Sequence, residues 1–184
     1  MKKDQRWVVT RVDGKIASVS ADFSGLPKVA EYVRDGHTVT LPLRGYSMRP
    51  YLEDGRDKAL LTKAPEKLKI GDVILAEISP KSYALHRIVD ISGDNITMYG
   101  DGNFSPEHIH RCDVLAIATG FYRKGSERVT PVDSFWYTCY WHLWLKLRPL
   151  RYPLLLCYRA KNNPREFISK SFNKILKICK LRKE

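Results

Sequence analysis

"KIGDVILAEISPKSYALHRIVDISGDNITMYGDGN", residues 69–103, contains three consecutive apolar runs that are separated by short polar segments. Each run is rich in Val, Ile, Leu or Tyr, and each is bounded by Gly, Asp, Asn, Pro or Ser. Runs of this length and composition are typical of β-strands. The Ser-Gly-Asp-Asn segment at 92–95 is typical of a hairpin turn. The stretch therefore predicts successive antiparallel strands.

Strand-like runs of the same kind lie on both sides of this stretch. One of them, "HTVTLPL" (37–43), alternates as a strand does, and two more are the short apolar runs "DKALLTK" (57–63) and "DVLAIATGFYR" (113–123). Regular spacing of such runs favours a mainly β protein. We expect a compact, mostly antiparallel β domain over residues 38–124.

The first 37 residues carry two local signals. Two short strands are expected around the Asp13-Gly14 turn. A short helix is then expected to begin at Pro27, which suits a first helical turn, and to end at Gly36. Residues 1–37 should therefore form a hairpin and a short helix.

The C-terminal part carries nearly all of the net charge. The chain has 184 residues, with 32 Lys or Arg and 20 Asp or Glu. Of these, 12 basic and 2 acidic residues lie in residues 146–184, which leaves 20 basic and 18 acidic residues for the rest. Residues 134–159 are dense in aromatic side chains, and a basic amphipathic helix is expected over 166–183. We expect residues 125–184 to form an aromatic, basic C-terminal extension with helical structure.

A serine lies in a bend within "LRGYSMRPYLEDGRD", residues 43–57. Gly45 permits a tight bend, and Met48 and Pro50 supply apolar groups that would pack it onto the sheet. A serine presented in this way can act as a nucleophile once a base takes its proton, and the N–H groups of the bend can bind an oxyanion. The alternative is that Ser47 is a hydrogen-bonding turn residue.

Two further residues could complete a catalytic site with this serine. His86 lies in the strand-like run "YALHRIVDI", and an imidazole can act as a base because it titrates near neutral pH. Asp101 lies between two glycines in "MYGDGN", where a carboxylate could orient the histidine. The alternatives are a histidine with structural hydrogen bonds and an ordinary Gly-Asp-Gly turn.

The order of these segments resembles the type I signal peptidase and LexA-like superfamily of serine proteases. The nucleophile segment of that family is similar to "GYSMRP", the next segment to "KIGDVILAE", the general-base segment to "LHRIVDI", and the segment that closes the site to "YGDGN". The resemblance covers about residues 36–120. Most bacterial members place a lysine at the base position. His86-Arg87 resembles instead the histidine type of the endoplasmic reticulum, archaea and sporulation.

The resemblance implies a role for each of these residues and the fold of that superfamily. Ser47 would be the nucleophile, His86 the general base and Asp101 its acidic partner. Gly45 and Met48 would support the bend that binds the oxyanion.

Other polar residues near these segments have supporting or structural roles in this interpretation. Histidine-type members often carry a further aspartate pair after the Gly-Asp-x-Asn segment, and Glu107 is the residue of this chain that could substitute there. Asp57 and Asp72 are interpreted as caps of turns that precede strands. Arg87 follows the expected base in a strand, so its side chain should point to the opposite face.

No metal ion or other cofactor is predicted. The four cysteines lie far apart, and no pair has CxxC spacing. His108 and His110 alternate in what we expect to be a loop, without the i, i+4 spacing of metal ligands on a helix.

Membrane contact is expected, if at all, through the C-terminal extension. Residues 1–37 contain no apolar run of about 18 residues that could anchor the chain, so a cytoplasmic location is expected. The aromatic residues between 136 and 144 and the basic helix after them suit an anionic membrane surface. The alternative is that residues 135–147 cap the β core. Nucleic acid is not an expected partner, because no platform of aromatic and basic residues is evident on the sheet.

These observations favour one function and leave others open. The first hypothesis is a Ser/His endopeptidase that cleaves a leader peptide or another small protein precursor, in the cytosol or at the inner membrane surface. The second is a catalytically inactive peptide-binding or membrane-associated module on the same fold. A self-cleaving repressor is a weaker third, because the first 37 residues leave no room for a helical DNA-binding domain.

Overall fold

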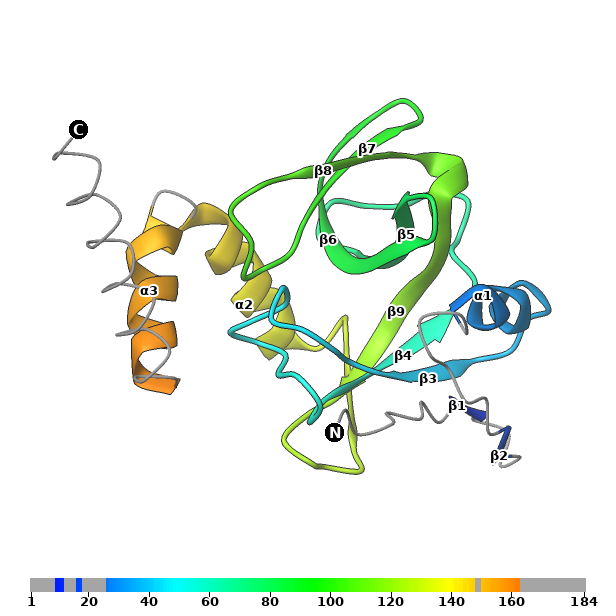
Figure 1. The fold of residues 1–184 in the computed structure, drawn as a ribbon, viewed down its shortest axis with the longest axis horizontal. Helices are drawn as coiled ribbons and strands as arrows, with labels where there is room; N and C mark the ends of the chain where they lie inside the picture. The colour runs from blue at the N-terminus through cyan, green and yellow to red at the C-terminus, as the bar shows by residue number, and fades with distance from the viewer. Residues whose placement is uncertain (1–8, 12–15, 18–25, 148–149, 163–184) are drawn as a thin grey trace, which may run out of the picture. The chain divides into compact units, whose positions relative to one another are not determined.

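A computed structural model describes residues 9–11, 16–17, 26–147 and 150–162 of the chain (Figure 1). In chain order the described elements are β1 (Val9–Arg11), β2 (Ile16–Ala17), α1 (Leu26–Arg34), β3 (Val39–Pro42), β4 (Lys58–Thr62), β5 (Val73–Ser79), β6 (Ser82–Ser92), β7 (Asn95–Tyr99), β8 (Glu107–His110), the 3-10 helix η2 (Arg111–Asp113), β9 (Val114–Tyr122), β10 (Val129–Pro131), α2 (Phe135–Lys146) and α3 (Arg151–Asn162). The predicted mainly β class is confirmed.

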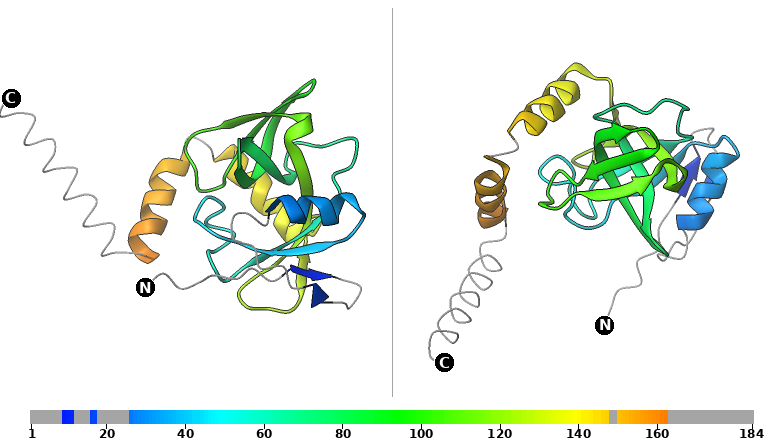
Figure 2. Two further views of the ribbon diagram at one scale, coloured as in Figure 1. Left: turned by 45° about the vertical axis from the view of Figure 1, so that its right-hand side comes forward. Right: turned by 90° about the horizontal axis from the view of Figure 1, so that it is seen from above.

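The described strands form one sheet in the order β2-β1-β3-β4-β9-β5-β6-β7-β8, and β10 pairs with β9. All of these pairs are antiparallel. The long strand β9 joins two halves of the sheet, because residues 117–122 pair with β4 while residues 114–117 pair with β5. Strands β5 and β8 also contact each other, so β5–β8 curl into a lobe at one end of β9, while α1 packs on β3 and β9 (Figures 1 and 2).

Strand β5 lies between two hydrophobic cores. Val73 and Leu75 belong to the core that is shared with β3, β4 and β9, whereas Ile74 and Ala76 belong to the core of the β5–β8 lobe. Successive side chains of a strand point to opposite faces, so a strand that is covered on both faces needs a continuous apolar run. This accounts for the uninterrupted apolar sequence of β5.

Helix α2 packs its aromatic side chains on the first core. Tyr137 and Trp144 are buried, and Tyr140 and Trp141 pack against the core cluster. Gly71 has a φ of +100°, and a Cβ built there would lie 2.6 Å from the Trp141 ring. Glycine at this position is therefore needed both for the backbone conformation and for the close approach of the helix. Of the two alternatives for this segment, capping of the β core is confirmed for this face of α2.

The other face of α2 exposes Phe135, Trp136 and Leu143. The chain divides into two compact units, Met1–Leu145 and Lys146–Glu184. Nearly all of helix α2 therefore lies in the same unit as the sheet. Among the described helices, none is long and apolar enough to cross a membrane.

Two strands were not anticipated from the sequence. Strand β8 pairs with β7 where we expected a loop, and it buries Ile109 while His108 and His110 point outward. A four-residue strand with one apolar side chain gives too weak an alternation to be recognised. Strand β10 is three residues long and ends at Pro131, a residue type that is uncommon within sheets.

The N-terminal part of the chain and the turn before β7 follow the prediction. The N-terminal hairpin is confirmed by the pairing of β1 with β2, although its Asp13-Gly14 turn lies outside the described residues. Helix α1 and the hairpin turn at 92–95 are also confirmed, and Gly93 in that turn has a φ of +59°. The basic helix expected over 166–183 lies outside the described residues.

Asp57 ties the segment that follows β3 to the far end of β9. Its side chain is 1% exposed and accepts hydrogen bonds from the backbone N–H groups of Glu53 and Lys124, both at 2.9 Å, and from the Arg56 guanidinium at 2.7 and 2.8 Å. Burial alone would raise the pKa of this carboxyl, but the hydrogen bonds from Arg56, Lys124 and Glu53 outweigh it and lower the pKa below its ordinary value. The predicted turn-capping role is confirmed.

Asp57→Asn is expected to lower the free energy of unfolding by about 2 kcal/mol at pH 7, because a buried charged acceptor is lost. Since the folded-state pKa is lowered, this stabilisation is present above the ordinary carboxyl pKa and is lost as the pH falls through the folded-state value. Urea denaturation at pH 7 and at about pH 4 and below measures both effects. The exposed Asp90→Asn change is the control, and equal stability of Asp57→Asn and wild type at pH 7 would contradict the assignment.

Candidate active site

The bend around Ser47 is fixed by buried apolar neighbours. Met48 and Leu52 are 6% and 2% exposed, and the Leu52 N–H donates to the Met48 carbonyl at 3.0 Å. Gly45 opens the bend with a φ of +85°, and its N–H donates to the Asp54 carboxylate at 2.8 Å. The apolar residues around the serine therefore anchor the bend to the core and leave Ser47 half-buried.

The turn after β7 packs directly against this bend. The Gly102 N–H donates to the Ser47 carbonyl at 2.6 Å. A Cβ built on Gly100 would lie 2.5 Å from the same carbonyl oxygen and 2.9 Å from His86 Nε2, and one on Gly102 would lie 2.6 Å from the Tyr46 carbonyl oxygen. Because these neighbours are mostly backbone, both positions require glycine. The Gly-Asp-Gly turn thus brings the serine bend and His86 to one place.

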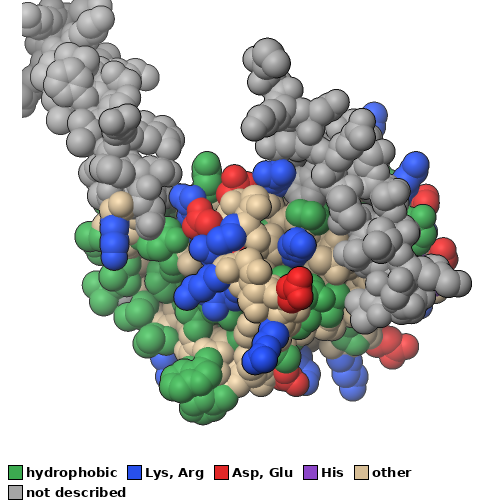
Figure 3. Space-filling model, turned by 90° about the horizontal axis from the view of Figure 1, so that it is seen from below, with side chains coloured by type: hydrophobic (Ala, Val, Ile, Leu, Met, Phe, Trp, Pro, Cys, Tyr) green, Lys and Arg blue, Asp and Glu red, His purple; other side chains and the backbone are tan. Residues whose placement is uncertain are grey.

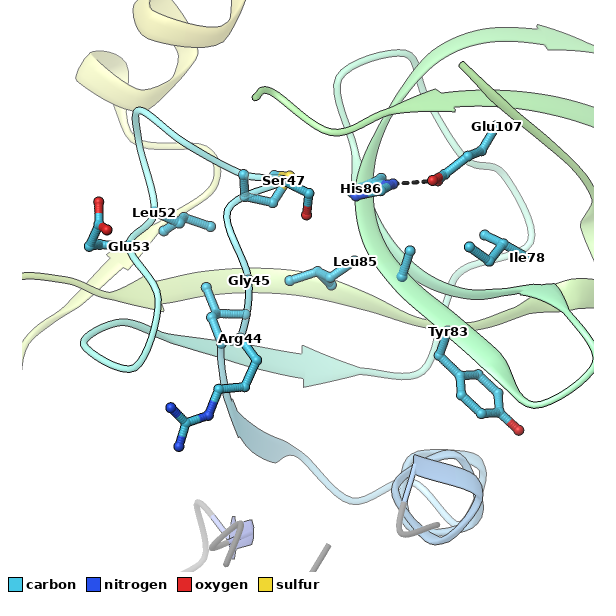
Figure 4. A pocket seen from close by; sticks show the side chains of 13 residues that line it. Arg44, Gly45, Ser47, Leu52, Glu53, Ile78, Tyr83, Leu85, His86 and Glu107 are labelled. Atoms are coloured by element: carbon cyan, nitrogen blue, oxygen red, sulfur yellow. Dashed lines mark hydrogen bonds and ion pairs between the residues drawn. The ribbon is translucent and has the colours of Figure 1, made fainter. Parts of the chain in front are cut away.

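His86 lies on β6 and is 3% exposed. Its Nδ1 forms a hydrogen bond with the carboxylate of Glu107, the first residue of β8. A neutral imidazole that donates from Nδ1 to a carboxylate has Nε2 free to accept a proton. Nε2 is the ring nitrogen next to Gly100 and the serine bend. Figure 4 shows Ser47 and His86 pointing toward one another, with Glu107 on the far side of the imidazole.

Ser47 and His86 line one cavity of about 270 Å³ (Figure 4). Its apolar walls come from the serine bend and from the ends of β5 and β6, and they consist of Leu43, Met48, Leu52, Ile78, Tyr83, Ala84 and Leu85. Among the described residues, the Ser47 hydroxyl and His86 form no hydrogen bond. Such pairs are often too long to bond before substrate binds.

Asp101, the expected partner of His86, forms its side-chain ion pair with Arg87. The Asp101 carboxylate accepts from Arg87 Nε at 3.0 Å and from Arg87 Nη2 at 2.7 Å, and it also accepts from the Tyr140 hydroxyl at 3.1 Å. Arg87 and Asp101 are 1% and 2% exposed. The two carboxylates have therefore separate partners: Glu107 contacts the histidine, and Asp101 neutralises the buried arginine. The prediction that Arg87 points away from the face of His86 is confirmed.

The buried arginine and the tyrosines of α2 form one hydrogen-bond network. Arg87 Nη1 donates to the Gly71 carbonyl and reaches the Tyr137 hydroxyl, both at 3.0 Å. Burial would lower the pKa of Arg87, but the Asp101 carboxylate outweighs it and raises that pKa. Burial raises the pKa of Tyr137 to about 12 although Arg87 opposes it, and burial together with Asp101 raises the pKa of Tyr140. Both tyrosines therefore remain protonated, Tyr137 as an acceptor from Arg87 and Tyr140 as a donor to Asp101.

The candidate oxyanion donors are in the same bend. The Gly45 N–H is occupied by Asp54, so Gly45 supports the bend through its conformation. Among the described residues, the N–H groups of Ser47 and Met48 have no hydrogen-bond acceptor. Both residues line the cavity, so these two N–H groups could bind an oxyanion there.

Some residues of the site had only a weak signal in the sequence. Glu107 was considered as a substitute carboxylate, and its short strand gave no sign of which face it occupies. Tyr83 and Leu85 alternate in β6, which places both on one wall of the cavity, but alternation alone does not separate a cavity wall from a core.

Comparisons with known proteins gave no match, whether to a protein-family model, to a curated protein or to a solved structure.

Replacing the Asp101 carboxylate is expected to affect stability more than replacing the Glu107 carboxylate. Asp101→Asn should lower the free energy of unfolding by about 3 kcal/mol, because it leaves the Arg87 charge buried without its counter-ion. Glu107→Gln should lower it by less than about 1 kcal/mol, because the Glu107 side chain is partly exposed and the amide can still bond the ring. Urea denaturation at pH 7 measures both, and the opposite ranking would contradict the structural assignment.

Proposed function

We propose that the chain is a serine endopeptidase of the signal peptidase and LexA-like type. The observation that carries this proposal is that Ser47 and His86, which are far apart in the sequence, line the same cavity and point toward one another (Figure 4). The hydrogen bond of His86 Nδ1 with Glu107 adds a group that can orient the base. The antiparallel β architecture and the sequence resemblance over residues 36–120 support the same superfamily.

The proposed reaction uses this geometry in two steps. His86 Nε2 accepts the Ser47 hydroxyl proton while the serine oxygen attacks a peptide carbonyl, and Glu107 stabilises the imidazolium that forms. The N–H groups of Ser47 and Met48 bind the oxyanion. The imidazolium then protonates the leaving amine, and a water molecule activated by His86 hydrolyses the acyl-enzyme.

The proposed substrate is an extended segment of a leader peptide or another small protein precursor. Strand β6 pairs with β7 only from Arg87 onward, so residues 82–86 have no partner strand on that side among the described elements. An extended peptide could add to this edge directly beside His86. The apolar cavity walls could then take an apolar side chain of the substrate.

A catalytically inactive peptide-binding module on the same fold is the alternative. The same free edge of β6 and the same cavity would bind a peptide without cleaving it. Reactivity of the serine separates the two functions.

A fluorophosphonate probe is expected to label wild type at Ser47, because attack of an activated serine on phosphorus expels fluoride. Labelling should be absent in Ser47→Ala and at least about tenfold slower in Glu107→Gln, since a carboxylate that orients a base contributes to its efficiency. Mass spectrometry of the labelled protein measures these rates.

The labelling experiment has a matched control in Ser82→Ala, which removes another serine of the peptide-binding strand. Labelling of Ser47→Ala at the wild-type rate would show reaction elsewhere, and no labelling of wild type between about pH 6 and 9 would favour the peptide-binding module.

A peripheral contact with anionic membranes is a second proposal, and the cytoplasmic location at the inner membrane surface goes with it. Exposed Phe135, Trp136 and Leu143 favour it, because aromatic and aliphatic side chains insert at the headgroup level. Figure 3 shows exposed hydrophobic side chains and Lys and Arg side chains on the same face. Trp136→Ser should reduce sedimentation with anionic vesicles, and unchanged sedimentation of wild type with and without vesicles would refute the contact.

A further inference from the structure

Helix α2 contacts the turn that packs against the serine bend. Trp144 Nε1 donates to the Asp101 carbonyl at 3.0 Å, and the Tyr140 hydroxyl donates to the Asp101 carboxylate at 3.1 Å. Residues four apart share one face of a helix, and these two rings stack with centroids 6.1 Å apart. Both donors of this face are therefore directed at one residue of the turn.

The Asp101–Gly102 peptide unit links α2 to the serine. Its carbonyl accepts from Trp144, and its N–H donates to the Ser47 carbonyl at 2.6 Å. A peptide bond is planar, and in the usual trans form its C=O and N–H point in opposite directions. The hydrogen bond from the Trp144 indole thus fixes the orientation of this peptide plane, and the N–H of the same plane bonds the serine bend. The two hydrogen bonds also polarise each other.

The Asp101 side chain cannot fix this plane alone. Arg87 holds its carboxylate with two hydrogen bonds, but rotation about the side-chain bonds leaves the plane of the following peptide free. Neighbouring Gly100 and Gly102 lack a Cβ, and glycine is the most permissive backbone residue. Backbone hydrogen bonds of Gly102 with Ser47 and of Asn103 with Gly100 also hold this turn, and Trp144 is a donor from outside it that bonds the Asp101 carbonyl directly.

We propose that Trp144 and Tyr140 are positioning residues, which hold the Gly100–Gly102 turn so that Ser47 and His86 share one geometry. This inference rests on the proposed function for its effect on catalysis, but the geometric part does not depend on it. The aromatic helix therefore has a role in the site as well as in the core. It acts through the turn, without contact to substrate.

The test compares Trp144→Phe, which keeps an aromatic ring but removes the N–H donor, with wild type. Amide hydrogen exchange measured by NMR should show the Gly102 N–H exchanging roughly three to ten times faster in the variant, as expected for the loss of one supporting hydrogen bond. The Gly71 and Ile88 amides, which bond to Ile88 and Asp72 carbonyls away from the turn, should keep their wild-type rates. Trp136→Phe on the exposed face of α2 is the matched control.

The kinetic readout separates positioning from a general loss of stability. In Trp144→Phe, the maximal rate of fluorophosphonate labelling at Ser47 should fall about tenfold while the probe concentration that gives half of this rate stays within about twofold, because the cavity walls are untouched. Tyr140→Phe removes only a hydroxyl and leaves the Asp101 carboxylate bonded by Arg87. It should therefore change the Gly102 exchange rate and the kinetics in the same direction as Trp144→Phe, but by less. It also provides the measurement if Trp144→Phe does not fold.

The outcomes are distinguishable from those of the proposed function. Faster exchange at Gly102 alone supports the positioning role even where the fluorophosphonate does not label wild type, in which case only the enzymatic proposal fails. Unchanged exchange at Gly102, or an equal increase at Gly71 and Ile88, overturns the inference while leaving a labelled Ser47 as evidence for the enzyme.

Discussion

The buried Arg87–Asp101 ion pair holds together three segments that lie next to the site. Two opposite charges at 1% and 2% exposure are stable only when their remaining donors and acceptors are satisfied. Here the partners come from the Gly71 carbonyl before β5, from the turn after β7 and from α2. None of these segments can shift without leaving a charge or a hydrogen-bonding group unpaired in the core. The pair therefore fixes where the Gly-Asp-Gly turn, and with it the serine bend, can lie.

Two consecutive residues of β6, His86 and Arg87, have different roles: the first lies in the candidate site and the second in the buried hydrogen-bond network. His86 bonds Glu107 and lines the cavity, while Arg87 is buried in the network with Asp101 and Tyr137. Adjacent side chains of a strand point to opposite faces, so a histidine and an arginine in sequence can occupy both environments. A register shift of one residue would exchange them and place the arginine in the cavity. The pairing of β5 and β6 thus determines the site as well as the fold.

Long apolar patterns in the sequence predicted the strands correctly, whereas the partners of the polar side chains could not be predicted. Strands β5, β6 and β9 were predicted because their runs are continuous, and Ser47 and His86 were chosen because their segments resemble a known order. Asp101 was expected to orient His86 and Glu107 was given only as a possible substitute for a further aspartate, because neither short polar segment has a periodicity that shows which carboxylate faces the histidine. Only the pairing of β8 with β7 shows that Glu107 faces the histidine.

The aromatic composition of α2 follows from the buried polar groups that its inner face must bond. Leucine or phenylalanine would also cover an apolar core, but neither can donate a hydrogen bond. The buried Asp101 carboxylate and carbonyl and the Arg87 guanidinium need polar partners, and each unsatisfied group would cost about 1–3 kcal/mol. Tyrosine and tryptophan combine a large apolar ring with one polar atom, so they fill the space and meet this need together. The outer face carries Phe135, Trp136 and Leu143, which are exposed and do not take part in this network. The aromatic residues of α2 suggested contact with a membrane surface, but those on its inner face are accounted for by the buried Arg87–Asp101 pair that they bond.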